Sequence, residues 1–183
     1  FGGNSLFTGV DSRLRYQLRQ GSRCRPFVAG AVQHQSWHGQ SLLNGLETKL
    51  GVGGDCAVAG RPNQRLGLES SLLYNAALNS GRLGGDRVGW QLRLQWQVAI
   101  AGGLISTRFD HTTLEDQRGY SQLLADNARR RVSRNSVLVQ YRRPLSASGT
   151  DLLVNFYHQD QGSSLSLFRT EDTSLEVGLS WRF

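Results

Sequence analysis

Apolar and polar residues alternate along most of this 183-residue chain. The alternation is strictest in the last ten residues, where every second side chain is apolar and the others are small or polar. A period of two places apolar side chains on one face of a β-strand and polar ones on the other. We therefore predict a terminal strand over 174–183, with an apolar face made of Leu175, Val177, Leu179, Trp181 and Phe183.

The same pattern predicts eight strands before it, and the clearest is 89–100. There the apolar residues Trp90, Leu92, Leu94, Trp96 and Val98 alternate with Gln91, Arg93, Gln95 and Gln97. Alternation is poor in 27–37, which we still interpret as a strand. It is absent from 115–134, and we interpret that segment as a loop. The predicted strands span 5–18, 27–37, 46–58, 65–78, 89–100, 104–114, 136–145, 151–159 and 174–183.

Short and long connections alternate between these strands. Short ones lie near Arg23, Arg61, Gly102 and Ser148, and longer ones near Gly39, Arg82, Leu124 and Ser164. This asymmetry is typical of outer-membrane barrels, and a strand of about ten residues crosses a membrane at a tilt. The pattern favours an all-β, antiparallel, up-and-down transmembrane β-barrel, with residues 1–183 forming one barrel domain.

The number of predicted strands also bears on the size of the barrel. Single-chain bacterial barrels have an even number of strands with both ends in the periplasm. Nine strands, the first of them running toward the periplasm, indicate further strands upstream, so we expect the C-terminal part of a longer chain. The alternative fold is a soluble β-sandwich that acts as a binding module, because its strands alternate too.

Composition agrees with the membrane interpretation. A hydrophobic content of 38% is low for a two-layer soluble core but natural for a barrel that needs apolar residues only on its outer face. No segment approaches the ~20 apolar residues of a membrane helix, and the first four residues lack the features of a signal peptide. The net charge of +7 comes from arginines spread along the strands, so we predict no nucleic-acid partner.

Charged residues occupy the polar faces of the predicted strands. In a barrel they project into the lumen, where they either pair with one another or line a slightly cationic pore for a polar or anionic substrate. Trp90, Leu92, Leu94, Trp96 and Val98 and the apolar face of the terminal strand then face lipid. The predicted lumen-lining residues are Asp11, Arg13, Arg15, Glu47, Lys49, Asp55, Glu69, Arg93, Arg108, Asp110, Arg142, Glu176 and Arg182.

The two cysteines, Cys24 and Cys56, permit one disulfide in an oxidising compartment. We place Cys24 in the turn before the second strand and Cys56 near the end of the third. Both then lie at the periplasmic rim of adjacent strands, within reach of a bond. Two unpaired thiols are the alternative. The cysteines are too few for a metal site, and we predict no metal or cofactor.

A basic run occupies the predicted 115–134 loop. Arg129, Arg130 and Arg131, with Arg134 after them, either contact anionic lipopolysaccharide or lie on a solvated loop.

One histidine raises an enzymatic alternative. His158 precedes Ser163 and Ser164, and outer-membrane lipid A deacylases use a histidine and a serine in such a place. Their serine follows the histidine at a spacing of two, where this chain has Asp160. A base must lie within hydrogen-bond reach of its nucleophile. We therefore predict a protein that is not an enzyme and keep a lipid acyl hydrolase as the alternative.

Four C-terminal segments resemble a known family. They read GYSQLLADNARRRV from Gly119, VLVQYRRPL from Val137, YHQDQGSSLSLF from Tyr157 and LEVGLSWRF from Leu175. They are similar to the closing strands of the barrels that follow tetratricopeptide-repeat segments in the surface lipoprotein assembly modifier family. The terminal Phe183 resembles the C-terminal signal of bacterial outer-membrane barrels.

The resemblance implies a component of secretion or surface assembly in the outer membrane of a Gram-negative bacterium. Its implied partners are outer-membrane lipid and lipopolysaccharide, the barrel-assembly machinery through the C-terminal strand, and a periplasmic repeat domain upstream. From the sequence we therefore expect a barrel module that works as a pore, a translocation component or an anchor.

Overall fold

The computed structural model describes residues 7–18, 23–100, 102–121, 127–145 and 149–181. These residues form one antiparallel sheet, with short 3-10 turns at Ser41–Leu43 and Ser166–Phe168. Each strand pairs with the next one along the chain, which confirms the predicted all-β, up-and-down topology. The nine strands are β1 (Phe7–Gln17), β2 (Cys24–Trp37), β3 (Gly45–Val58), β4 (Arg61–Ala77), β5 (Arg87–Ile100), β6 (Gly103–Asp116), β7 (Arg131–Pro144), β8 (Thr150–Ser163) and β9 (Thr170–Trp181).

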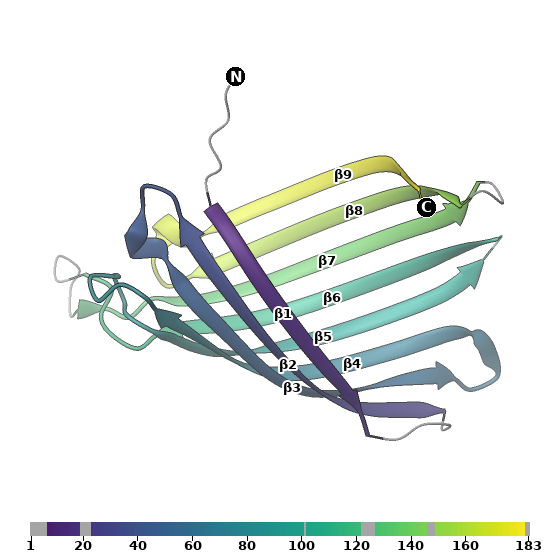
Figure 1. Ribbon diagram of the computed structural model, residues 1–183, viewed down its shortest axis with the longest axis horizontal. Coiled ribbons are helices and arrows are strands. Elements are labelled where there is room, and N and C mark those ends of the chain that lie inside the picture. The colour runs from purple at the N-terminus through teal and green to yellow at the C-terminus, as the bar shows by residue number, and fades with distance from the viewer. Residues whose placement is uncertain (1–6, 19–22, 101, 122–126, 146–148, 182–183) are drawn as a thin grey trace.

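The sheet is curled but open (Figure 1). β1 and β9 are its two edges, and no ladder of hydrogen bonds joins them in the described residues. Because every neighbouring pair is antiparallel, the first and ninth strands run in the same direction. The predicted closure into a barrel is therefore not a property of this sheet.

The connections fall into two groups, as predicted. We call the end of the sheet where β1 and β9 begin the loop end, and the opposite end the turn end. At the loop end the connections cover 38–44, 78–86, 117–130 and 164–169; at the turn end they cover 18–23, 59–60, 101–102 and 145–149. Figure 1 places the longer connections together on one side of the molecule.

The strands reach further toward the loop end than predicted. β6 continues to Asp116 and β7 begins at Arg131, so strands occupy both ends of the region that we interpreted as a loop. Polar cross-strand pairs replace apolar ones there: Arg131 donates to Glu115 at 2.7 Å across the β6–β7 pair. Such pairs stabilise a sheet without apolar alternation, so the sequence pattern ended before the strands did. β8 and β9 likewise extend toward the loop end beyond the predicted strands 151–159 and 174–183.

The second strand also begins earlier than predicted, at Cys24, which lies in β2 and not in a turn. The whole of β2 is regular, with Phe27 opposite Gly53 and Ala31 opposite Lys49. Its alternation was hard to detect because its inward-facing residues include small, apolar alanines.

The register assigns polar residues to the concave face of the sheet and apolar residues to the outward face. One cavity of about 390 Å³ is lined by Arg13 of β1 and Arg93 of β5, so the polar faces of these strands curve toward each other. Many apolar side chains of the outward face are exposed, with exposed fractions of 75% for Leu14 and 69% for Leu175. Among the described residues, only Phe27, Leu73 and Val98 are buried hydrophobic residues. A closed apolar core is therefore missing from the part of the chain that the structure describes.

No helix in the described residues is long and apolar enough to cross a membrane.

Candidate functional site: the charged concave face

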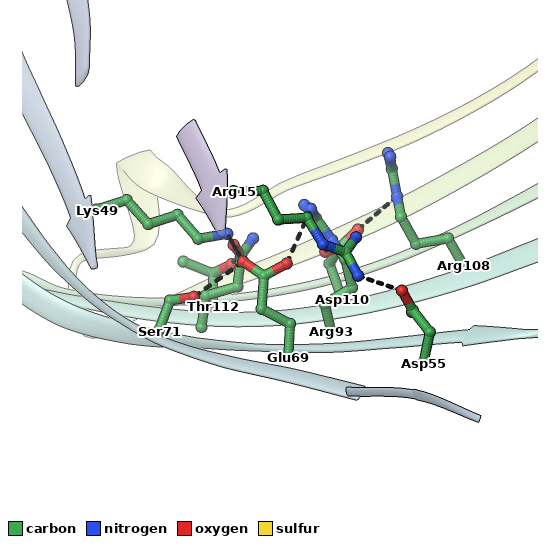
Figure 2. Close-up of polar contacts among 10 residues, drawn as sticks. Arg15, Lys49, Asp55, Glu69, Ser71, Arg93, Arg108, Asp110 and Thr112 are labelled. Carbon is green, nitrogen blue, oxygen red and sulfur yellow. Dashed lines mark hydrogen bonds and ion pairs between the residues drawn. The ribbon is translucent and has the colours of Figure 1, made fainter. Parts of the chain in front are cut away.

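Five charged side chains form a continuous ladder across β3–β6 (Figure 2). Glu69, Arg93 and Asp110 stand directly opposite one another on β4, β5 and β6. Lys49 Nζ lies 2.8 Å from Glu69 Oε1, and Arg93 Nε lies 2.6 Å from Asp110 Oδ1. Arg108 Nε completes the charge ladder at 2.8 Å from Asp110 Oδ2. Opposite charges thus alternate from strand to strand.

Polar neighbours make further hydrogen bonds to the charged groups of the ladder. Lys49 Nζ donates to Gln91 Oε1 at 2.6 Å, and the Ser71 hydroxyl donates to Glu69 at 3.1 Å. Asp110 is 7% exposed. Buried charges are tolerated when they are paired and hydrogen-bonded. The ladder therefore fixes the concave face of four strands, which agrees with the structural interpretation of these charges.

Another ion pair lies outside the ladder, nearer the turn end, beside Gly53 and Gly67. Arg15 of β1 pairs with Asp55 of β3, and its guanidinium carbon lies 3.5 Å from the centroid of the Phe27 ring. A Cβ on Gly53 would lie 2.5 Å from the Phe27 ring, and one on Gly67 would lie 2.7 Å from Asp55 Oδ1. Glycine at these two positions lets Phe27 and Asp55 lie flat against the sheet beneath Arg15.

The remaining predicted lumen residues that the structure describes lie on the concave face but not in the ladder. Arg142 pairs with Asp151 on β8, and Asn75 donates to Glu47 at 3.4 Å. The register places Arg13 and Glu176 on this face too, without an ion-pair partner among the described residues. Arg182 and Phe183 lie outside the described residues.

The predicted lipid-facing residues share the outward face. Trp90, Leu92, Leu94, Trp96 and Val98 alternate with concave-face residues along β5, and Leu175, Val177, Leu179 and Trp181 do so along β9. All are half-buried or exposed except Val98, which is 6% exposed. Neighbouring side chains therefore cover Val98, which contributes little to the exposed apolar area of the outward face.

The sequence interpretation missed a buried cluster at the loop end. Asp116, 1% exposed, accepts a hydrogen bond from Arg130 at 2.9 Å and lies 3.2 Å from Arg87 Nε. The Arg130 guanidinium also stacks on the rings of Tyr120 and Phe168, at 4.9 and 4.5 Å from their centroids. Asp116 and Asp110 are both even-numbered residues of β6 and therefore share a face, a signal that was available in the sequence. The aromatic partners of Arg130 come from two separate loops and had no such signal.

This cluster corrects our interpretation of the basic run. Arg130 is buried, and Arg131 begins β7 and pairs with Glu115, so neither arginine extends from a solvated loop. Arg134 donates to Gln161 at 2.8 Å. Of the four arginines, Arg129 is exposed, and its side chain makes no hydrogen bond or ion pair among the described residues.

Two groups of the 78–86 connection have shifted pKa values. Burial lowers the pKa of Arg82, and the positive charge of Arg130 adds to the effect. Hydrogen bonds from the Tyr74 hydroxyl and the Ala77 backbone N–H lower the pKa of Asp86. Asp86 thus remains a carboxylate and ties the end of β4 to the loop that follows it.

The structure does not bring His158 together with Ser163 or Ser164. His158 faces outward from β8, where its Nδ1 lies 2.9 Å from the Thr173 hydroxyl. Ser163 lies at an odd position of the same strand and therefore on the opposite face. The Ser164 hydroxyl is occupied by backbone groups of Arg131 and Arg129.

The predicted disulfide is confirmed. Cys24 and Cys56 are directly opposite on β2 and β3, with Cα atoms 4.0 Å apart, and they are bonded. The bond lies at the turn end, beside Arg25 and Asp55.

Within the described residues, no group of three or more His, Cys, Asp or Glu side chains is placed to hold a metal ion.

Searches of protein-family models, curated proteins and solved structures found no match to this chain.

Proposed function

We propose that this chain is an outer-membrane β-barrel module that works as a pore, a translocation component or an anchor in export or surface assembly. The observation that carries the proposal is the contrast between the two faces of the sheet. Its outward face exposes large apolar side chains on strand after strand, whereas its concave face holds the ion pairs. A soluble monomer rarely exposes a continuous apolar surface of this kind.

The height of the apolar face supports a membrane setting. Val88 to Ile100 on β5 spans about 40 Å at the usual rise per residue. At the usual strand tilt of about 40°, this becomes an apolar band about 30 Å tall, which matches a bilayer. Trp90 lies near the loop-end limit of that span, where aromatic girdles occur in such barrels, and Trp96 lies within the span.

The two edges of the sheet indicate how a barrel would close. Because β1 and β9 run in the same direction, direct pairing between them would be parallel. An odd number of further strands between them makes every pair antiparallel. We propose that strands outside this sequence supply that closure, as the resemblance to the surface lipoprotein assembly modifier barrels also implies.

Gel migration in detergent tests the proposal. A membrane barrel resists unfolding in detergent, so the protein, refolded into lipid vesicles, should migrate differently before and after boiling. Urea should not extract it from the vesicles. A protein that remains soluble without detergent and runs identically before and after boiling would contradict the proposal and favour a soluble β-sandwich.

A further inference from the structure

Four arginines converge on the concave face at the turn end of the sheet. Arg15 of β1, Arg23 just before β2, Arg25 of β2 and Arg65 of β4 line one cavity of about 300 Å³. Asp55 is the one acidic residue among the described residues that line it. We call these four residues the turn-end arginine cluster.

The single carboxylate does not neutralise the cluster. Asp55 is engaged by Arg15, and no carboxylate among the described residues lies within ion-pair distance of Arg23, Arg25 or Arg65. The charge ladder differs, since each of its cations has an acidic partner there. Like charges that converge on one cavity repel each other unless an anion joins them.

Several contacts hold the arginine cluster in place before any ligand arrives. Arg15 stacks on the buried Phe27 ring. The Cys24–Cys56 disulfide joins β2 to β3 between Arg23 and Arg25, and the Ala57 backbone N–H donates to the Arg23 carbonyl at 2.9 Å. A site whose walls are fixed in advance loses less entropy when it binds.

We propose that the turn-end arginine cluster binds a soluble ligand that carries phosphate groups. A guanidinium presents a planar fork of N–H donors that matches phosphate oxygens two at a time, and the cavity has room for more than one phosphate. This inference rests on the proposed function in one respect, since it assigns a class of ligand to one mouth of the proposed pore.

Calorimetric titration of the protein, folded in detergent micelles, with inorganic pyrophosphate at low ionic strength tests the inference. We expect saturable binding that weakens as salt is added, because salt screens the charges. The double variant Arg25→Gln/Arg65→Gln should bind about tenfold more weakly or worse. Arg134→Gln/Arg143→Gln is the matched control: it removes the same charge at the loop end and on the outward face, and it should bind within about twofold of the parent.

Two results would overturn the inference. One is the absence of saturable binding to protein that circular dichroism shows to be folded as a β-sheet. The other is an equal loss of affinity in both double variants, which would mean that pyrophosphate responds to net charge and not to this cavity. Both readouts are independent of membrane insertion, because binding is measured in micelles and the proposed function is tested by heat-dependent migration.

Discussion

At the scale of single residues, Asp110 is the side chain on which the charge ladder most depends. It accepts a hydrogen bond from Arg93 and forms an ion pair with Arg108, and replacing it leaves Arg93 with Glu69 at 4.0 Å as its remaining acidic neighbour. We predict that Asp110→Asn lowers the free energy of unfolding by about 3–5 kcal/mol, as expected when one partner of a buried pair is removed. Urea unfolding in vesicles measures the change. Glu115→Gln, which breaks an exposed pair, should cost less than about 1 kcal/mol; equal costs would mean that the ladder is not buried.

Gly53 provides a second test at this scale. A Cβ there would press on the Phe27 ring and on the Leu68 carbonyl oxygen, whereas a Cβ on Gly178 would meet nothing within 4 Å. We predict that Gly53→Ala destabilises the protein by about 1–3 kcal/mol through overpacking. Gly178→Ala, on the same face, should be neutral or slightly stabilising. If the two variants unfold at the same urea concentration, Phe27 does not pack against Gly53.

At the scale of strands, the disulfide has the clearest consequence. It joins β2 to β3 across 32 residues of sequence, and the chain-entropy model assigns a loop of this size about 3–4 kcal/mol. We predict that Cys24→Ala/Cys56→Ala lowers the free energy of unfolding in urea by that amount. Thiol titration of the oxidised parent should find no free thiol. An unchanged midpoint after reduction would show that the β2–β3 ladder holds the two strand ends without the bond.

The strands also show which parts of the fold the sequence could predict. Strict alternation in β5 and β9 located those strands because one face of each is uniformly apolar. It missed the loop ends of β6 and β7, where the outward face is polar and the backbone ladder continues through pairs such as Glu115 and Arg131.

The candidate site was predictable to a similar degree. Parity placed Glu69, Arg93 and Asp110 on one face, but only the register between strands makes them direct partners. The turn-end arginine cluster has no local signal either, because its members come from three strands that lie together only in the curled sheet.

At the scale of the whole molecule, the proposed function requires that the outward face of the sheet contacts lipid and the concave face contacts water. Leu94 and Gln95 are consecutive residues of β5 on opposite faces, and neither belongs to an ion pair among the described residues. Replacing Leu94 with Arg should cost about 2–4 kcal/mol if the side chain lies near the middle of a bilayer. Gln95→Arg is the matched control and should cost less than half as much, since it adds a charge to a polar face. Urea unfolding of the two variants in vesicles gives the comparison, and similar costs would place both faces in the same surroundings.

Fluorescence quenching by lipid tests the central claim most directly. A single cysteine at Leu94 or at Gln95, labelled with an environment-sensitive dye in the otherwise native protein, is reconstituted into vesicles that contain brominated acyl chains. The account predicts strong quenching and a blue-shifted emission for the dye at Leu94, and little quenching for the dye at Gln95, because their side chains point to opposite faces. Equal quenching at both positions, or stronger quenching at Gln95, would contradict the assignment of the apolar face to lipid and the charged face to an aqueous lumen.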